Sequence, residues 1–464
     1  MSHRFHLLRG FLLALPLAAQ MPPNFHAHQH QMFMQQMQMH QMHMQARQAA
    51  LEAKRAQQAV LMARKGAPSA QPLLVKPSRE AWVGPALEGD FQPCLEGAAL
   101  LGVAKEPRKL VLLDRITGKV RWEAALEADL LLPPTALTKE VLYVTRDDQG
   151  VLLDLATGAP QQKLALAPYD RFLMSGKKDH PRVLPPVEVG GRLFLAIYGK
   201  GRKTGNAEGK MQAFDIATGT KAWEVEIPGG PDLMPVIHGS RVIVGGAGWV
   251  MALEVATGQD AWKRFVGSPY SASEMDFGFQ DGNRLLLTCA NSRIALDLAS
   301  GKELWREKVR AEGTSTLTGE GNRAVHLESR GFLVKSAWLV ALDTATGKLA
   351  WEREAARTLF PWAQDGRVTC NQENDLLQLD LKDGKVLWKQ TLGSHPAAPF
   401  LPGERVLYVA HKDGKASVLK ALLLQDGQPR WSHTLATPYE SGFILADDKG
   451  LVYLGEGGKP VRVE

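Results

Sequence analysis

The segment LDTATGKLAWERE, residues 342–354, decides the fold because close copies of it recur along the chain. Residues 296–308 read LDLASGKELWREK, and residues 214–226 read FDIATGTKAWEVE. The copies align on a glycine and are spaced by 40, 61, 39, 43, 46, 37 and 43 residues. A period near 40–45 residues is typical of four-stranded propeller blades and of some paired-helix arrays. The aligned glycines are Gly118, Gly158, Gly219, Gly258, Gly301, Gly347, Gly384 and Gly427.

The pattern inside the repeats favours strands over helices. Short apolar runs such as RIALD (293–297) and WLVALD (338–343) precede the glycine, and runs such as NRLLLT (283–288) precede those. Turn residues (Gly, Asn and Asp) separate the runs, and none of the repeats has a sustained 3.6-residue period. The sequence therefore predicts an all-β propeller of four-stranded antiparallel blades.

The repeated phrase is predicted to be a strand, a tight turn and a second strand. In seven copies an acidic residue stands four residues before the glycine, where it can accept hydrogen bonds from turn N–H groups. The glycine supplies a positive φ. A tryptophan follows four residues later, and such a ring buries ~150–250 Å², so we expect it to pack between neighbouring blades. These tryptophans are Trp122, Trp223, Trp262, Trp305, Trp351, Trp388 and Trp431, and Gln162 replaces the ring in the second copy.

The pattern (A/L)LD-x-x-TG-x-x-x-W resembles the repeat of the PQQ-like β-propeller family over residues 90–464. One branch of that family, the quinoprotein dehydrogenases, holds pyrroloquinoline quinone (PQQ) and calcium at the centre of eight blades. Another branch is non-catalytic and includes the propeller subunit of the outer-membrane β-barrel assembly machinery. The dehydrogenases carry two adjacent cysteines, whereas the cysteines here are Cys94, Cys289 and Cys370. The resemblance therefore implies a non-catalytic propeller with no cofactor, and PQQ with calcium is the alternative.

The number of blades has two interpretations. The resemblance and the eight phrases imply eight blades. Residues 443–464 nevertheless read as further strands without the phrase, and SREAWVG (78–84) places Trp82 as in the strand after the turn. If these two ends share a blade, the ring closes with nine blades and has no open edge.

The N-terminal residues predict an exported protein, periplasmic or secreted. Residues 1–19 combine a basic start with the short apolar run 11–17, as in a secretory signal peptide, and the run is too short to span a bilayer. Gln20 stands where a lipoprotein signal has its cysteine, so we predict no lipid anchor at the cleavage site and no transmembrane segment elsewhere. The following parts are a Met/His/Gln-rich segment at 20–45, a helical segment at 46–65, a linker at 66–80 and the propeller at 81–464.

The charge distribution argues against a nucleic-acid partner. The net charge is +6, but residues 1–65 hold seven basic residues and one acidic residue. The remaining residues hold 48 charges of each sign. A nucleic-acid-binding protein concentrates positive charge on its folded body, so we expect a protein partner instead.

The segment at 20–45 is a candidate copper site. Thioether and imidazole groups suit Cu(I), and a copper-handling role is one alternative function of the chain. The other interpretation is a low-complexity tract that binds metal only incidentally. The candidate ligands are His26, His28, His30, Met37, Met39, His40, Met42, His43 and Met44.

The longest interval between repeats points to a docking surface. It holds two insertions, residues 168–186 and 199–210, which propeller geometry places on the face opposite the TG turns. Loops on a rigid scaffold often carry binding, so we predict a docking surface for an acidic envelope protein; an ordinary variable loop pair is the alternative. The predicted function is a non-catalytic interaction scaffold, with a PQQ- or metal-dependent oxidoreductase as the rival. The candidate residues are Tyr169, Arg171, Phe172, Lys177, Lys178, His180, Arg182, Lys200, Arg202 and Lys203.

Overall fold

The computed structural model describes residues 76–464 apart from gaps at 89–91, 94–98, 171, 175–176, 180–181, 202–206, 230–232, 268–274, 290–291, 310–312, 331–335, 356–360, 395–400, 403–404 and 448. The expected signal peptide, the candidate copper ligands and the expected helical segment lie outside the described residues. Within them, strands dominate, and a 3-10 turn, η2 (Glu456–Gly458), joins two of the last strands.

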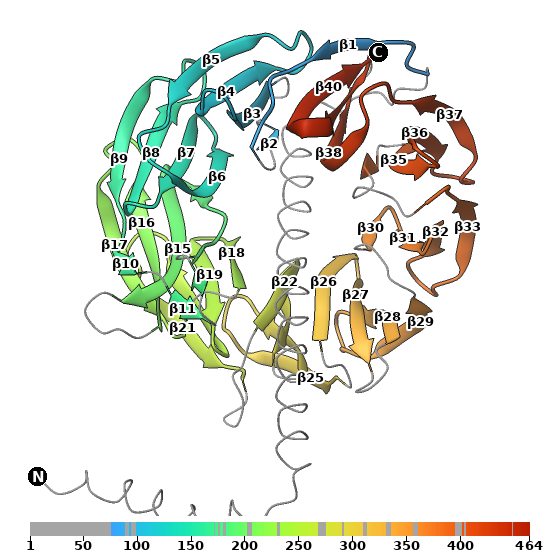
Figure 1. Ribbon diagram of the computed structural model, residues 1–464. Helices are drawn as coiled ribbons and strands as arrows, with labels where there is room; N and C mark the ends of the chain where they lie inside the picture. The colour runs from blue at the N-terminus through green and yellow to red at the C-terminus, as the bar shows by residue number, and fades with distance from the viewer. Residues whose placement is uncertain are drawn as a thin grey trace, which may run out of the picture. The chain divides into compact units, whose positions relative to one another are not determined.

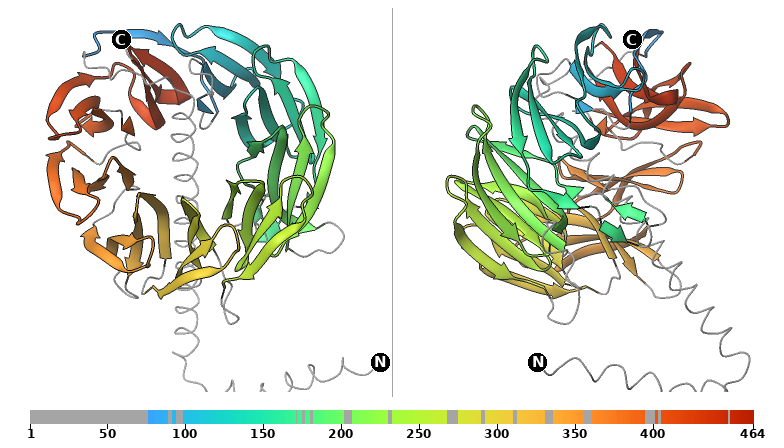
Figure 2. Two further views of the ribbon diagram at one scale, coloured as in Figure 1. Left: turned by 180° about the vertical axis from the view of Figure 1, so that it is seen from behind. Right: turned by 60° about the vertical axis from the view of Figure 1, so that its left-hand side comes forward.

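Nine antiparallel sheets in the described part of the chain surround a central axis, which confirms the predicted all-β propeller (Figures 1 and 2). We number the sheets as blades 1 to 9. In the blades whose first and fourth strands Figure 1 labels, the first strand lies toward the centre and the fourth at the rim.

The strands of blades 1 to 4 follow the chain order. Blade 1 has β2 (Gln92–Pro93), β3 (Ala99–Ala104), β4 (Lys109–Asp114) and β5 (Val120–Ala125). Blade 2 has β6 (Leu130–Ala136), β7 (Glu140–Thr145), β8 (Gln149–Asp154) and β9 (Pro160–Ala165). Blade 3 has β14 (Val187–Val189), β15 (Arg192–Gly201), β16 (Ala207–Asp215) and β17 (Lys221–Ile227), with β10 (Tyr169–Asp170) and β13 (Arg182–Val183) also on β15. Blade 4 has β18 (Leu233–His238), β19 (Arg241–Gly246), β20 (Trp249–Glu254) and β21 (Asp260–Phe265).

Blades 5 to 8 repeat this order. Blade 5 has β22 (Met275–Asp281), β23 (Arg284–Cys289), β24 (Ser292–Asp297) and β25 (Glu303–Lys308). Blade 6 has β26 (Gly313–Glu320), β27 (Arg323–Arg330), β28 (Ser336–Asp343) and β29 (Leu349–Ala355). Blade 7 has β30 (Trp362–Gln364), β31 (Arg367–Gln372), β32 (Asp375–Asp380) and β33 (Val386–Thr391). Blade 8 has β34 (Leu401–Pro402), β35 (Val406–Asp413), β36 (Ala416–Leu423) and β37 (Pro429–Thr434).

Blade 9 joins the two ends of the described chain. Its first three strands are β38 (Tyr439–Ala446), β39 (Leu451–Gly455) and β40 (Lys459–Val463), and its fourth is β1 (Glu80–Val83), paired antiparallel with β40. The nine-bladed alternative is therefore the one that forms, and the eight blades implied by the resemblance are not. The reason is that residues 439–463 form three paired strands without the repeated phrase, and β1 supplies the fourth.

The repeated phrase forms a tight turn held by its own carboxylate. In blade 6, Gly347 N–H donates to the Asp343 carbonyl at 2.8 Å, and Asp343 N–H donates to the Lys348 carbonyl at 2.9 Å. The Thr346 N–H and hydroxyl both donate to Asp343 Oδ1, at 3.0 and 2.8 Å. Gly347 has a φ of 73°, which an L side chain resists. The turn is thus specified within six residues of sequence.

Six of the seven phrase tryptophans pack on the phrase glycine of the next blade. The Trp351 ring is buried, and its Nε1–H donates to the Leu381 carbonyl of blade 7 at 2.9 Å. A Cβ on Gly384 would lie 2.6 Å from the Trp351 ring, so only glycine fits there. The same contact joins Trp122 to Gly158, Trp223 to Gly258, Trp262 to Gly301, Trp305 to Gly347, and Trp388 to Gly427. The phrase therefore sets both the turn and the spacing between blades.

The seam between blades 2 and 3 lacks this ring. Gln162 Nε2–H donates to the Ala217 carbonyl at 2.9 Å, and the Gln162 side chain lies 3.1 Å from the Cβ position of Gly219. The amide thus keeps the hydrogen bond of an indole but buries less apolar area.

We expect Gln162→Trp to raise the free energy of unfolding by about 1 kcal/mol, because it adds buried aromatic area at a site whose neighbour is already glycine. Urea denaturation of the two proteins measures the difference. Gln161→Trp, at the exposed neighbouring position, is the matched control and should change stability by less than about 0.5 kcal/mol. A destabilised Gln162→Trp variant would contradict the proposed fit.

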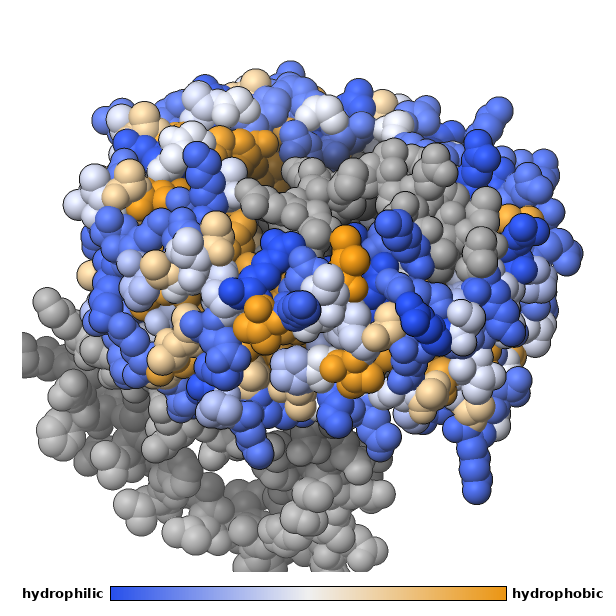
Figure 3. All heavy atoms as spheres, turned by 90° about the horizontal axis from the view of Figure 1, so that it is seen from above, coloured by the Kyte–Doolittle hydropathy of each residue, from blue (hydrophilic) through white to orange (hydrophobic). Residues whose placement is uncertain are grey.

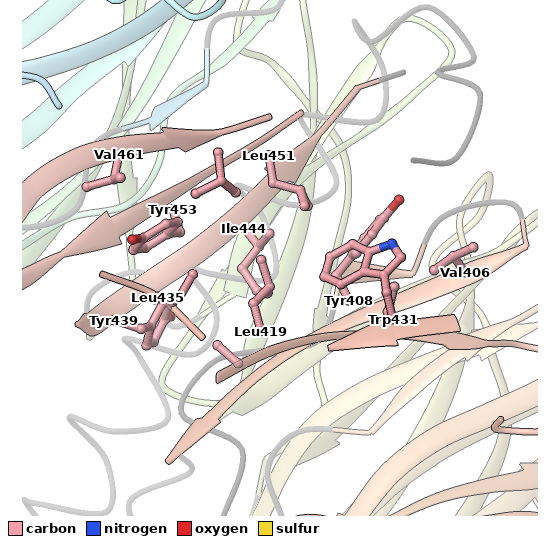
Figure 4. Close-up of a cluster of buried hydrophobic side chains, with 13 residues drawn as sticks. Val406, Tyr408, Leu419, Trp431, Leu435, Tyr439, Ile444, Leu451, Tyr453 and Val461 are labelled. Atoms are coloured by element: carbon pink, nitrogen blue, oxygen red, sulfur yellow. The ribbon is translucent and has the colours of Figure 1, made fainter. Parts of the chain in front are cut away.

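The apolar core lies in the seams between blades. At the seam of blades 8 and 9, Tyr408 and Trp431 lie with ring centroids 6.1 Å apart, and Tyr439 and Tyr453 lie 6.3 Å apart (Figure 4). Ile444 lies buried in the same cluster. Each four-stranded sheet buries both of its faces against its neighbours, so the blades stabilise one another in sequence around the ring.

A buried ionic cluster reinforces blade 9. The Arg462 side chain is fully buried, and its two terminal nitrogens donate to the carboxylate of Asp447 at 2.8 and 3.0 Å. Its Nε–H donates to Glu464 Oε1 at 2.7 Å. Arg115 of blade 1 places Nη2 3.4 Å from Asp447 Oδ2. The cluster therefore ties the last blade to the first.

Candidate functional site

The two insertions of blade 3 meet on one strand. β15 and β16 form a hairpin longer than those of most other blades, and Lys200 pairs with Ala207 near its end. On its other side, β15 pairs with the first insertion, with Tyr169 opposite Gly201 and Arg182 opposite Tyr198. Between these pairings the chain forms a separate hairpin of β11 (Phe172–Met174) and β12 (Lys177–Asp179). The insertions therefore form one extension of blade 3, labelled β10, β11 and β15 in Figure 1.

The structure describes the backbone of most predicted docking residues. Tyr169, Phe172, Lys177, Lys178, Arg182 and Lys200 lie on β10, β11, β12, β13 and β15. Arg171, His180, Arg202 and Lys203 lie outside the described residues. The side chains of the whole set are not described, so their use as contacts stays a prediction.

A buried polar network anchors the root of the first insertion. Gln212 is fully buried on β16, and its Oε1 accepts a hydrogen bond from the N–H of Ala167, one residue before the insertion. Gln212 Nε2–H donates to Glu224 Oε2 at 2.8 Å, and Lys210 Nζ donates to Glu224 Oε1 at 2.6 Å. Burial raises the pKa of Glu224, but hydrogen bonds from two lysines and Gln212 outweigh it and hold the pKa at about 2.

This network predicts a pH dependence. Because the folded pKa of Glu224 lies below its usual value of 4.5, its contribution to stability is present above about pH 4.5 and is lost as the pH falls toward 2. We expect Glu224→Gln to lose about 1–2 kcal/mol of stability at pH 7, with the difference from the wild type shrinking between pH 4.5 and 2. Chemical denaturation at several pH values tests this. Glu226→Gln, at an exposed position on the same strand, should show no such trend; a constant difference for Glu224→Gln would contradict the assignment.

Blade 4 carries an aromatic cluster with a lysine. Trp249 on β20 pairs across the sheet with Phe265 on β21, with ring centroids 5.1 Å apart and planes tilted by 55°. Phe265 is 45% exposed. Lys263 Nζ lies 5.1 Å from the centroid of the Trp249 ring, at cation–π distance. The cluster offers an apolar contact with a positive charge beside it.

The cluster lies next to blade 3. The turn before Trp249 has Ala247 at φ 46° and Gly248 at φ 80° and joins the second and third strands of blade 4, as the long hairpin does in blade 3. A Cβ on Gly229, just after β17, would lie 2.2 Å from the Ala247 side chain, so the exit of blade 3 packs directly on this turn. We define the candidate docking surface as residues 168–186 and 199–210 with Trp249, Lys263 and Phe265.

Sequence reasoning missed the blade 4 part of this surface. The available signal was the position of Trp249, which lies nine residues before Gly258, outside the repeated phrase. A tryptophan without the repeated packing role needs another explanation. The pairing with Phe265 depends on strand register, which the sequence pattern alone did not assign.

The two cysteines that the structure describes lie apart in the ring. Cys289 and Cys370 are buried in the seams of different blades, and burial raises the pKa of the Cys370 thiol to about 12. Among the described residues no group of three or more His, Cys, Asp or Glu side chains is placed to hold a metal ion. The part of the chain that the structure describes also has no helix long and apolar enough to cross a membrane.

The closed ring, the repeated Asp-x-x-x-Gly turn and the stacked tryptophans define a β-propeller of the PQQ-like class. The chain belongs to the family whose model is described as "Outer membrane protein assembly factor BamB", which matches residues 76–167, 176–288, 271–353 and 290–450. It is 24% identical over 313 residues to Outer membrane protein assembly factor BamB of Yersinia pestis, covering 60% of this chain and 75% of that protein. The corresponding protein of Moranella endobia is 23% identical over 222 residues, covering 45% of this chain and 53% of that protein.

Two solved structures are similar to this chain. A quinohemoprotein alcohol dehydrogenase from Comamonas testosteroni aligns with a TM-score of 0.52 and 13% identity, covering 87% of this chain and 79% of that chain. BamB from Moraxella catarrhalis aligns with a TM-score of 0.44 and 13% identity, covering 84% and 98%. At these identities the similarity shows the fold alone.

Proposed function

We propose that this chain is an exported propeller that acts as a non-catalytic scaffold and docks another protein of the cell envelope. Membership of a family described as an outer membrane protein assembly factor supports an envelope role. The observation that carries the docking role is the candidate docking surface, where two insertions share one strand of blade 3 and blade 4 carries the Trp249–Phe265 pair, with Phe265 45% exposed.

The chemistry of this surface favours an acidic partner with an apolar contact. Aromatic side chains at the centre of an interface supply most of its binding energy, and charged groups at the rim steer the encounter. Phe265 and Trp249 provide the aromatic element, and Lys263 provides a cation beside them. The two insertions carry further basic residues in their sequence.

Crosslinking in the native envelope tests the proposal. A photoreactive amino acid at position 265 should capture an envelope protein, and mass spectrometry identifies it. Deletion of residues 199–209, or Lys263→Glu, should abolish this product while the thermal unfolding temperature of the purified protein stays within a few degrees.

The matched control is Leu349→Ser on blade 6, where an equally exposed apolar residue follows the TG turn on the other face. It should leave the crosslinked product unchanged. If the deletion variant folds and captures the same partner at the same yield, the docking surface is elsewhere. A quinone absorbance band in the purified protein, or bound calcium with dye-linked alcohol oxidation, would replace the scaffold function with an oxidoreductase.

A further inference from the structure

A short segment of the chain closes the ring. We call residues 78–88 the closing segment. It precedes blade 1 in sequence, yet its strand β1 completes blade 9, more than 350 residues away. Its backbone N–H groups donate to carbonyl groups at the end of the chain at 2.7–3.1 Å. Ser78 and Arg79 donate to Glu464, Gly84 donates to Pro460, and Leu87 donates to Gly458.

The closing segment rebuilds the repeated turn from two separate pieces of chain. Ser78 stands four residues before Trp82, the place of the phrase glycine, and its N–H donates to the Glu464 carbonyl at 2.7 Å. In blade 1 the Gly118 N–H donates to the Asp114 carbonyl at 2.8 Å in the same way. The turn of blade 9 therefore forms without a covalent link between its two halves.

Side chains make the acceptor site selective. Trp82 Nε1–H donates to the Ile116 carbonyl at 3.0 Å, and a Cβ on Gly118 would lie 2.5 Å from the Trp82 ring. Glu80 accepts hydrogen bonds from the N–H and hydroxyl of Thr437, at 2.7 and 3.2 Å. The site therefore recognises an extended strand with a carboxylate and, two residues later, an indole.

Without β1, the edge of β40 would be an open template for strand pairing. Residues Pro460–Val463 of β40 are buried, and unpaired apolar edge strands readily add a strand from another chain. Seen from above, the side of the ring that carries β1 is mainly hydrophilic with small separate apolar patches (Figure 3). Recognition at this site therefore depends on strand pairing with β40, on the Glu80 hydrogen bonds and on the Trp82 indole.

We propose that this acceptor site also takes the closing segment of a second copy of this chain, so that β1 can connect two propellers. The identical segment carries the same register, carboxylate and indole, which makes a second copy the occupant that fits best. The strand of the same chain competes at an effective concentration on the order of millimolar. Exchange therefore rises with protein concentration, and dilute protein stays monomeric.

A disulfide trap on the full-length chain tests the exchange. Arg79 and Glu464 exchange two backbone hydrogen bonds as an antiparallel pair, whose Cα atoms lie ~5.5 Å apart, within reach of a disulfide. One chain carries Arg79→Cys, a second of different size carries Glu464→Cys, and Cys94 is serine in both. The two are mixed under mild oxidation, and the heterodimer is measured on non-reducing gels. A single chain with both cysteines is the positive control and should crosslink within itself.

The effect of Trp82→Ala depends on which chain carries it. In the Arg79→Cys chain it weakens the incoming strand and should lower the heterodimer yield about tenfold. In the Glu464→Cys chain it weakens the competing strand and should raise the yield. Glu80→Gln replaces Trp82→Ala if that variant does not fold. As a background control, Glu456→Cys, at an exposed position, replaces Glu464→Cys in the second chain. The proposal is overturned if the heterodimer yield equals that of this control. It is also overturned if Trp82→Ala gives the same yield in either chain.

Discussion

Replacing Asp447 with alanine is expected to lower the free energy of unfolding by about 3–5 kcal/mol, because it removes the carboxylate that the buried guanidinium groups of Arg462 and Arg115 share. Arg462 is fully buried and donates two hydrogen bonds to Asp447, and Arg115 lies 3.4 Å from the same carboxylate. The carboxylate also accepts N–H bonds from Lys449 and Gly450. Urea denaturation of the wild type and the variant gives the difference.

Two controls separate this effect from a general loss of charge. Asp413→Ala, at an exposed position of blade 8, should change stability by less than about 0.5 kcal/mol. Asp447→Leu combined with Arg462→Met should lower the free energy of unfolding by less than Asp447→Ala does. The double variant removes both charges of the buried ion pair, so neither of the two is left unpaired. A loss below about 1 kcal/mol for Asp447→Ala would show that the cluster does not stabilise the closed ring.

The same carboxylate adds to acid sensitivity. Burial raises the pKa of Asp447, but the hydrogen bonds and charge of Arg462, with those of its other partners, outweigh burial and lower it. A depressed folded pKa gives a stability contribution that is present above the unfolded value of ~3.9 and is lost as the pH falls through the folded value. The stability gap between the wild type and Asp447→Ala should therefore narrow below about pH 4.

Trp351→Ala is expected to cost a similar ~3–5 kcal/mol, because it removes a buried ring and leaves a cavity between blades 6 and 7. The substitution also leaves the Leu381 carbonyl without its indole donor and empties the space against Gly384. Thermal and urea unfolding measure the loss.

Leu349→Ala provides the matched comparison for Trp351→Ala. It lies on the same strand but is 52% exposed, so its effect should stay within about 0.5 kcal/mol. Because blades 3 and 4 carry the candidate docking surface, crosslinking from position 265 should be unchanged in folded Trp351→Ala protein. Equal stability losses for the two variants would contradict the packing role of the indole.

The repeated phrase made the fold predictable because its information is local. The interactions that form the turn join residues close in sequence, such as the Asp343 carboxylate and Gly347 with its positive φ. The sequence pattern therefore indicates the turn and the strand after it directly. The position of Trp82 also pointed to the strand that closes the ring. The choice between eight and nine blades was open because it depends on which distant strands pair.

Other features depend on contacts between distant segments. The aromatic cluster of blade 4 requires the register that places Trp249 opposite Phe265. The buried cluster of Arg462 and Asp447 joins residues that carry no repeated pattern. The two insertions of blade 3 were expected on one face, but their pairing along β15 is a tertiary result.

The sequence by itself determined the blade, its turn and its packing ring, because each is encoded within about forty residues and is repeated. The tertiary structure alone decided the number of blades, the closing of the ring by β1, the pairing of the first blade 3 insertion with β15, and the pairing of Trp249 with Phe265 in blade 4. These features depend on the angle that each seam sets between neighbouring blades. They also depend on which strand edges are left unpaired where the first and last blades meet. The sum of these angles and the pairing of the last free edges are properties of the whole array, which no single repeat encodes.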